Sequence, residues 1–238
     1  MCLEAVVLAG GLGTRLRPVV ADRPKPMALV KGRPFLEYLL DYWIGQGVGR
    51  FVLSVGYRYE VISDHFGASY RGIPVRYAIE SSPLGTGGGL MQATGFLEGA
   101  GPLLVVNGDT YFPVSLSSFL RFHRDRESKL TMGLREVASA DRYGTVALGG
   151  EGQVLAFHAP GTVREPVSLI NGGVYLFERD LLEAYHRHWN EGEPVALEKD
   201  LFGWVFEQNA PFYGTIFRDS FIDIGIPSDY ERCQSLIG

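Results

Sequence analysis

Short apolar runs alternate with segments of helical spacing through the first half of the chain. Four runs have the composition and length of buried strands: Ala5–Ala9, Arg50–Val55, Val75–Ile79 and Leu103–Val106. Four segments that follow them show helical periodicity: Pro34–Gln46, Tyr59–Phe66, Gly87–Leu97 and Ser115–Arg126. Strands that alternate with helices predict a mostly parallel sheet that is covered on both faces.

The second half of the chain is richer in strand patterns. Strands are predicted at Leu130–Val137, Thr145–Leu148, Val154–His158, Val174–Phe177 and Ile216–Ile224. Helices are predicted at Arg179–Trp189 and from Ser228 onward, where Ser228 and Glu231 have the spacing of a capping box. Because no internal repeat, linker or low-complexity stretch interrupts this pattern, we expect one α/β domain over residues 1–238.

Composition narrows the class of protein. The 238 residues are 46% hydrophobic and 21% charged, which is typical of a soluble protein. The net charge of −5, without blocks of like charge, argues against nucleic-acid binding. Cys2 and Cys233 stand near opposite ends, so we expect neither disulfides nor a cysteine metal cluster, and a cytoplasmic location. We also expect no signal peptide and no membrane span.

A glycine-rich loop follows the first predicted strand. Residues 10–15 read GGLGTR, and the glycines at positions 10, 11 and 13 let the backbone approach a ligand closely. Successive N–H groups in such a loop form an anion-binding nest, to which Thr14 adds a hydroxyl and Arg15 a forked cation. The dinucleotide pattern G-x-G-x-x-G fails at Leu16, and the P-loop pattern is absent. For this loop alone, a plain glycine turn with a surface arginine is the alternative.

Lys25 strengthens the interpretation of the loop as a phosphate cradle. It stands between Pro24 and Pro26, which restrict the backbone on both sides. A lysine held in this way suits a fixed ligand better than solvent. The bare main chain, Arg15 and Lys25 together therefore predict a site for a polyphosphate.

Six stretches, in their order along the chain, resemble the signature motifs of the sugar-1-phosphate nucleotidyltransferases, also called sugar-nucleotide pyrophosphorylases. They are LAGGLGTRLRP with RPKPM, PLGTGGGL (83–90), VVNGDTYF (105–112), RYGTV (142–146), LINGGVYLF (169–177) and FIDIGIPSDY (221–230). The resemblance implies the family's Rossmann-like, mostly parallel sheet flanked by helices, a small β-rich sugar-binding region and no C-terminal β-helix. EKDLF (198–202), LINGGVY and SVGYRYEVISDHFG (54–67) look most like the D-glycero-D-manno-heptose 1-phosphate guanylyltransferases.

The resemblance implies a reaction in which an NTP and a sugar 1-phosphate give an NDP-sugar and pyrophosphate. It assigns catalytic roles to Arg15, on the β- and γ-phosphates, and to Lys25, near the α-phosphate. The nucleotide-binding positions that it implies are Leu8, Ala9, Gly10, Gly11, Gly13, Thr14, Glu80, Pro83, Gly85, Thr86, Asn107 and Gly108. It gives Mg²⁺ to Asp109 and Asp223, whose hard oxygen ligands suit this ion. Taken singly, Asp109 also fits an Asx turn and Asp223 a strand-end carboxylate.

Glu80 bears on the choice of base. Family members read the base at this position, and thymidylyl enzymes carry Gln there, which offers one donor and one acceptor. A carboxylate offers only acceptors, and guanine presents two adjacent donors, N1–H and the 2-amino group. Glu80 therefore favours GTP as the nucleotide, although a solvated loop glutamate is the plain alternative.

The implied sugar site draws on three later segments. Its expected residues are Gly144, Asn171, Gly172, Glu198 and Lys199. Many relatives carry an acidic residue and a sugar-phosphate lysine where this chain reads HAP at 158–160. Lys199 and Arg164 are the replacements that we consider. Turn geometry is the alternative for the two glycines, and a solvated charge pair is the alternative for Glu198 and Lys199.

The favoured function is GTP-dependent transfer to D-glycero-D-manno-heptose 1-phosphate. Mannose 1-phosphate with GTP, and N-acetylmuramate 1-phosphate with UTP, are alternatives within the class. A non-catalytic, nucleotide-sensing relative would be expected to lose Arg15, Lys25 or an aspartate, and a glycosyltransferase needs no triphosphate clamp. The expected partners are small-molecule substrates, with no nucleic acid and no membrane, and the chain is expected to be a monomer or homodimer.

Overall fold

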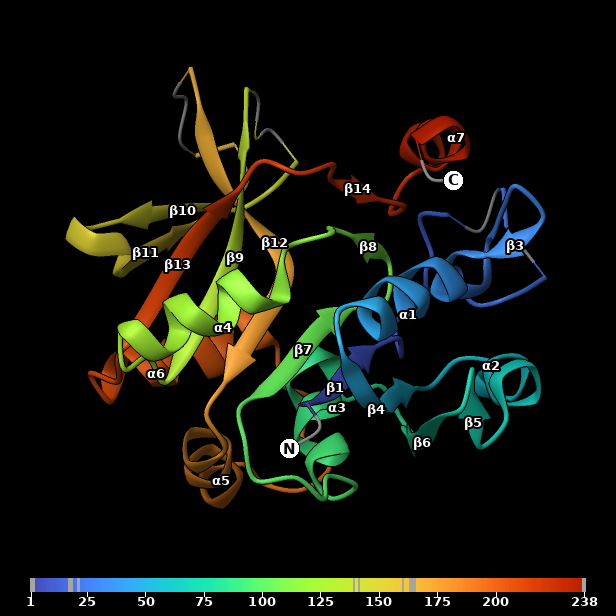
Figure 1. Cartoon of the computed structure of the whole chain (residues 1–238), viewed down its shortest axis with the longest axis horizontal. Coiled ribbons are helices and arrows are strands. Elements are labelled where there is room, and N and C mark those ends of the chain that lie inside the picture. The colour runs from blue at the N-terminus through green and yellow to red at the C-terminus, as the bar shows by residue number, and fades with distance from the viewer. Residues whose placement is uncertain are drawn as a thin grey trace.

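The order of strands in the main sheet divides the molecule into a parallel and an antiparallel half (Figure 1). The computed structural model describes residues 3–16, 19–20, 22–138, 140, 142–159, 161–162 and 166–236. Within them, the main path of the sheet runs β11-β10-β12-β7-β1-β4-β6-β5, while β9 joins through β12 and β13 joins through β9. The expectations for Cys2, Pro160 and Arg164 lie outside the described residues.

The parallel half carries the first predicted strands. It consists of β7 (Leu103–Asn107), β1 (Leu3–Leu8), β4 (Val48–Val55) and β6 (Ile73–Ile79). Alternate side chains enter two apolar layers, since Val6 packs into one cluster and Ala5 and Val7 pack into another. Strands that are apolar on both sides are those that a parallel sheet with two covered faces requires. The expected α/β fold with a flanked sheet is confirmed.

The helices cover the two faces of the sheet in separate sets. Those that share the cluster of Val6 are α3 (Gly85–Thr94), α5 (Arg179–His188) and α6 (Phe202–Glu207). Those that pack with Ala5 and Val7 are α1 (Phe35–Gly45), α2 (Tyr59–Phe66) and α4 (Leu116–Asp125). In Figure 1, α1 and α4 lie in front of the sheet. Both faces of the sheet are therefore covered by helices, so a ligand can reach the sheet only at the ends of its strands.

The antiparallel half begins where β12 lies beside β7. Its strands are β12 (Ser168–Phe177), β9 (Leu130–Val137), β13 (Phe212–Phe217), β10 (Thr145–Leu148) and β11 (Val154–His158). β12 runs antiparallel to β7 and β9, β13 runs parallel to β9, and β10 and β11 form a hairpin beside β12. The strand expected at Val174–Phe177 is thus the last part of a longer strand. A bulge between Asn171 and Tyr175 shifts its register against β9.

The C-terminal segment departs from the sequence-based expectation in two places. The single strand expected over Ile216–Ile224 is divided, because β13 ends at Phe217 and β14 (Ile222–Asp223) pairs separately with β8 (Thr110–Tyr111). The last helix, α7 (Pro227–Leu236), begins one residue before Ser228, so the expected capping box is wrong. Proline suits this first position because its missing N–H would have no partner there.

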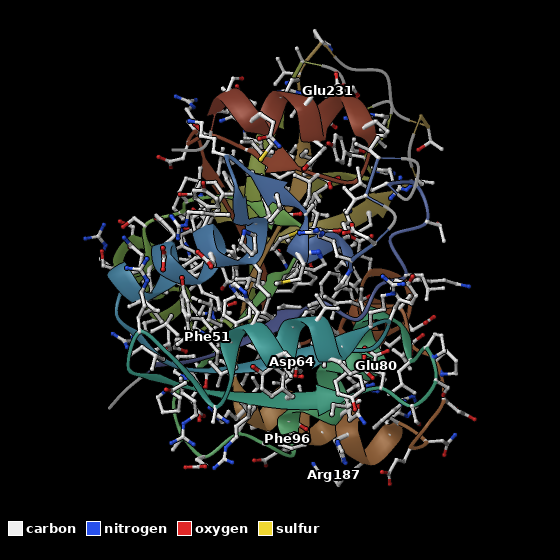
Figure 2. All side chains as sticks on the ribbon, turned by 90° about the vertical axis from the view of Figure 1, so that its right-hand side faces the viewer. Phe51, Asp64, Glu80, Phe96, Arg187 and Glu231 are labelled. Atoms are coloured by element: carbon white, nitrogen blue, oxygen red, sulfur yellow. The ribbon has the colours of Figure 1, made fainter. Side chains whose placement is uncertain are left out.

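The remaining elements are short. They are β2 (Leu29–Val30), β3 (Arg33–Pro34), β5 (Ser69–Tyr70), the 3-10 turns η1 (Lys25–Met27) and η2 (Gly150–Gly152), and the π-helical turn η3 (Leu197–Leu201). Figure 2, in which Glu231 marks α7 and Arg187 marks α5, shows these two helices at opposite ends of the molecule. Among the described residues, no helix has both the length and the apolar character needed to cross a bilayer.

Candidate active site

The glycine loop leaves the sheet at the carboxyl end of β1. The N–H of Ala9 still donates to the carbonyl of Ser54 on β4, at 2.8 Å, and the chain then turns out of the sheet. Gly13 has a φ of +58°, and a Cβ there would lie 3.0 Å from the Cβ of Lys25, so glycine is needed on both counts. Leu16 anchors the far end of the loop in a cluster with Ile222 and Ile224.

A cavity of about 440 Å³ opens over this loop, and we call it the first cavity. Most of the expected nucleotide-binding residues line it, and so do both expected catalytic residues. These lining residues are Leu8, Ala9, Gly10, Gly11, Gly13, Thr14, Arg15, Lys25, Glu80, Pro83, Gly85, Thr86, Asn107 and Asp109. Segments from β1, β4, β6, α3 and β7 thus meet at one edge of the parallel half, where open α/β sheets bind ligands.

Glu80, directly after β6, is fixed against the loop. Its Oε1 accepts a hydrogen bond from the hydroxyl of Ser54 at 3.1 Å, and its Oε2 accepts one from the N–H of Leu84 at 3.0 Å. A Cβ at Gly10 would collide with Oε1, and one at Gly89 would lie 2.9 Å from it. The two glycines therefore make the space for this carboxylate. Each oxygen keeps acceptor capacity toward the cavity, because a carboxylate oxygen has two lone pairs.

Lys25, Asp109 and Asp223 form a charged cluster beside the first cavity, which Lys25 and Asp109 line. The ammonium Nζ of Lys25 lies 2.5 Å from Oδ2 of Asp109 and 3.6 Å from Oδ1 of Asp223. The pairing of β8 with β14 brings the aspartates together, and the N–H of Ile224 donates to the carbonyl of Asp109 at 3.0 Å. Burial and the charge of Asp109 raise the pKa of Asp223, and Lys25 partly offsets them.

This cluster fits a divalent cation. Two carboxylates already converge on a cation, the ammonium of Lys25, and hard oxygen ligands of this kind suit Mg²⁺. Among the described residues, no group of three or more His, Cys, Asp or Glu side chains is arranged for a metal. A pair of carboxylates is nevertheless enough for Mg²⁺ when phosphate and water complete the shell. Asp109 and Asp223 are thus the residues that would hold the ion.

A second cavity, of about 500 Å³, adjoins the first. Four of the five residues expected to bind the sugar line it: Gly144, Asn171, Glu198 and Lys199. The Nδ2 of Asn171 donates to Oε1 of Glu198 at 2.6 Å and to the hydroxyl of Tyr175 at 2.7 Å. Arg15 lines both cavities, and Asp223 lines the second while its partners Lys25 and Asp109 line the first. The two cavities therefore meet at Arg15 and the charged cluster.

Two expected site residues, Gly108 and Gly172, line neither cavity. The N–H of Gly108 donates to the carbonyl of Leu8, and a Cβ there would lie 2.9 Å from that oxygen. A Cβ at Gly172 would lie 2.5 Å from the ring of Phe112. Both glycines serve close packing beneath the site.

Other residues line the two cavities although the sequence did not predict them as site residues. In the first cavity they are Leu12, Pro26, Ser54 and Gly225, and in the second Arg142, Tyr143, Phe157, Ile226 and the histidine–alanine pair at 158–159 that replaces the usual motif. Ser54 could have been expected from the sequence, because it is a polar residue at the carboxyl end of the predicted strand Arg50–Val55. In the structure it lies beside Leu8 of β1. Arg142 and Tyr143 are the first two residues of the RYGTV motif, in which Gly144 was the residue expected to bind the sugar.

A family model described as "Nucleotidyl transferase" matches residues 4–237. The chain belongs to this family. Two curated relatives named D-glycero-alpha-D-manno-heptose 1-phosphate guanylyltransferase align along nearly the whole chain. The protein from Aneurinibacillus thermoaerophilus is 40% identical over 98% of this chain and 97% of its own length. That from Campylobacter jejuni is 37% identical over 96% and 97%.

A solved structure supports the same relationship. HddC from Yersinia pseudotuberculosis, in a complex with GMP-PN, is 33% identical, and the match covers 98% of each chain with a TM-score of 0.83. The resemblance drawn from the loop and its accompanying motifs is confirmed at the level of the family. Membership of an enzyme family that transfers nucleotidyl groups also weighs against the glycosyltransferase alternative.

The contact between Gly10 and Glu80 yields a testable prediction. Gly10→Ala should expel the Glu80 carboxylate from its bonds with Ser54 and Leu84 and lower the unfolding free energy by about 1–2 kcal/mol. Gly11→Ala is the matched control, because nothing lies within 4 Å of its Cβ, and it should change stability by about 0.5 kcal/mol or less. Urea unfolding measures both. In a Glu80→Ala background the penalty at Gly10 should vanish; equal stabilities of the two single variants would contradict the contact.

Proposed function

We propose that this chain transfers a nucleotidyl group from an NTP, preferably GTP, to a sugar 1-phosphate. The first acceptor that we propose is D-glycero-D-manno-heptose 1-phosphate, with GDP-heptose and pyrophosphate as products. The observation that carries the proposal is the junction of two cavities at Arg15 and the Lys25–Asp109–Asp223 cluster. The names of the two curated relatives support the choice of nucleotide and acceptor. We further propose a cytoplasmic enzyme that works on small molecules as a monomer or homodimer.

The proposed reaction needs no side chain to act as a general base. A phosphate oxygen of the acceptor attacks the α-phosphorus, a new P–O bond forms, and the bond from that phosphorus to the β-phosphate oxygen breaks. Pyrophosphate leaves with the electron pair. Because the attacking oxygen is already an anion, the protein has to position two polyanions and offset their repulsion. The N–H groups of the loop, Arg15 and Lys25 supply that compensation.

The metal-binding role belongs to Asp109 and Asp223. A bound Mg²⁺ would neutralise phosphate charge at the reacting centre. Lys25 lies between the two carboxylates and has only 10% of its side chain exposed. When a triphosphate enters the first cavity, its α-phosphate competes with Asp109 for this ammonium. The ammonium of Lys25 can therefore change its partner from the carboxylates to the phosphate while it stays within the cluster.

Lys25→Ala should preserve the fold and reduce turnover by about 10²-fold or more, because a preorganised cation at the transferring phosphate is lost. Pyrophosphate release under saturating substrates measures turnover, and circular dichroism checks the fold. Lys129→Ala is the control: this lysine pairs with the exposed Asp180 and lines neither cavity. Near wild-type turnover of Lys25→Ala would contradict the role.

Glu80 tests the choice of base. Glu80→Gln replaces one acceptor by a donor, so it should lower kcat/KM for GTP by about 10- to 100-fold and improve UTP or dTTP relative to GTP. The amide oxygen can still accept from the N–H of Leu84 while the amide NH2 donates to the hydroxyl of Ser54, which keeps the side chain in place. Competition among nucleotides at low concentration gives the ratio directly. An unchanged preference would remove Glu80 from base recognition.

The proposed reaction is tested by a matrix of four NTPs against heptose, mannose and N-acetylmuramate 1-phosphates. We expect Mg²⁺-dependent pyrophosphate release with GTP and heptose 1-phosphate, because Glu80 offers guanine two acceptors. Omitting the acceptor provides the background rate. Release with UTP and none with GTP would overturn the nucleotide assignment, and release only with mannose 1-phosphate would overturn the acceptor assignment.

A further inference from the structure

The buried carboxylate of Asp229 lies just outside the catalytic cluster. This residue of α7 is only 6% exposed. Its Oδ2 accepts a hydrogen bond from Nη2 of Arg142 at 2.6 Å, and its Oδ1 accepts one from Nη1 of Arg232 at 2.8 Å. A buried carboxylate is costly unless it is paired, so two arginines satisfy it. The guanidinium of Arg142 is therefore held in place by the buried carboxylate of Asp229.

The guanidinium of Arg142 is held at the wall of the second cavity. Arg142 precedes β10, and 46% of its side chain remains exposed although Asp229 grips it. It also lies over the ring of Tyr143, with 5.2 Å from Cζ to the ring centroid. Both of its hydrogen bonds with described residues use Nη2, one to Asp229 and one to the hydroxyl of Tyr143. No described residue accepts a hydrogen bond from Nε or Nη1, so each of these nitrogens can donate a single charge-assisted hydrogen bond to a phosphate oxygen.

The place of Arg142 matches the position that an acceptor phosphate must take. The second cavity is lined by Arg142 and Arg15 and by Asp223, the member of the charged cluster that faces this side. An attacking phosphate has to stand beside the cluster, between it and the sugar. Arg15 is shared with the first cavity, where the triphosphate needs it. Among the described residues, Arg142 and Lys199 are the arginine and lysine side chains that line the second cavity and not the first.

Lys199 is the rival for this role. It lines the same cavity, but it follows Glu198, whose carboxylate is bonded to Asn171. Asn171 and Glu198 can both exchange hydrogen bonds with hydroxyls, so this part of the cavity suits the sugar ring. Lys199 therefore lies among the groups for the sugar, whereas the charge of Asp223 acts on Arg142.

We propose that Arg142 binds the phosphate of the acceptor sugar 1-phosphate and that Asp229 is its positioning residue. The inference rests on the proposed function and goes further, because it names the group that replaces the missing sugar-phosphate lysine. Asp229 accepts a hydrogen bond from Arg142 and holds the guanidinium in one orientation, so the phosphate meets a preorganised cation. α7 thereby contributes to acceptor binding although its carboxylate touches no substrate.

The experiment compares steady-state kinetics for five variants, with the sugar 1-phosphate that the wild type uses best. Arg142→Gln should raise KM for the acceptor about tenfold or more and leave KM for GTP within about twofold. Asp229→Asn should raise the same constant by a smaller factor, because the guanidinium is held less firmly but is not removed. Arg142→Lys should restore part of the loss, since it returns the charge without the planar guanidinium that Asp229 orients.

Arg232→Gln is the matched control. It removes the other arginine from the same carboxylate, and Arg232 does not line the second cavity. If Asp229 merely stabilises α7, Arg232→Gln and Arg142→Gln should have equal effects, and the proposal is overturned. Lys199→Gln runs in parallel, and a selective rise in acceptor KM there but not in Arg142→Gln assigns the phosphate to Lys199 and overturns the proposal. Melting curves for every variant confirm folding.

Failure of the proposed function has a different signature. If the wild type turns over no sugar 1-phosphate, the function and the role of Arg142 fall together. If the wild type is active and Arg142→Gln keeps the acceptor KM of the wild type, Arg142 alone is excluded. As a second readout, inorganic phosphate should compete with the acceptor in the wild type and compete several-fold less well in Arg142→Gln. Equal competition in both proteins would also overturn the proposal.

Discussion

The charge balance among Lys25, Asp109 and Asp223 is the interaction on which the site depends. Two carboxylates this close repel each other, and burial makes their charges more costly, as the raised pKa of Asp223 indicates. One ammonium between them offsets both effects. The three members of the cluster come from the start, the middle and the end of the chain, so the cluster joins segments that are distant in the sequence.

The packing beneath the cluster is arranged to keep these three segments together. Leu16 and Phe35 from the N-terminal region share an apolar cluster with Ile222 and Ile224, which flank Asp223. The two-residue strands β8 and β14 pair beside it. Such short strands contribute little on their own, and the apolar cluster fixes where they meet. The chemistry of the site is therefore supported by a core separate from the two large layers of the sheet.

Sequence reasoning recovered the features that follow from local pattern. Buried strands show as apolar runs, and the glycine loop and Asp109 follow such runs at the carboxyl ends of β1 and β7. It failed where a feature depends on distant partners. The segment around Asp223 resembles a long strand because it is rich in Ile and Phe, but the tertiary pairing with β8 leaves only two residues of strand.

The same limit applies to site residues. Gly108 and Gly172 are glycines for packing against Leu8 and Phe112, and a motif cannot distinguish a glycine beside a ligand from a glycine beside a ring. Arg142 is visible in the motif, but its partner Asp229 is 87 residues away in the sequence. Only the fold shows that Asp229 holds this arginine and that the arginine lines the second cavity. The missing information is therefore long-range contact rather than residue type.

The two cavities also differ in the part of the sheet that builds them, and this difference bears on specificity. Edges of the parallel half, with the glycine loop and Glu80, form the first cavity, while β11 and β12, with η3 and the segment before β10, line much of the second. The halves join where β12 lies beside β7, and Gly173 there approaches the side chain of Asn107. Residues of the hairpin and of η3 can thus change without disturbing the glycine loop. A fold divided in this way can keep one grip on a nucleotide while its acceptor site varies.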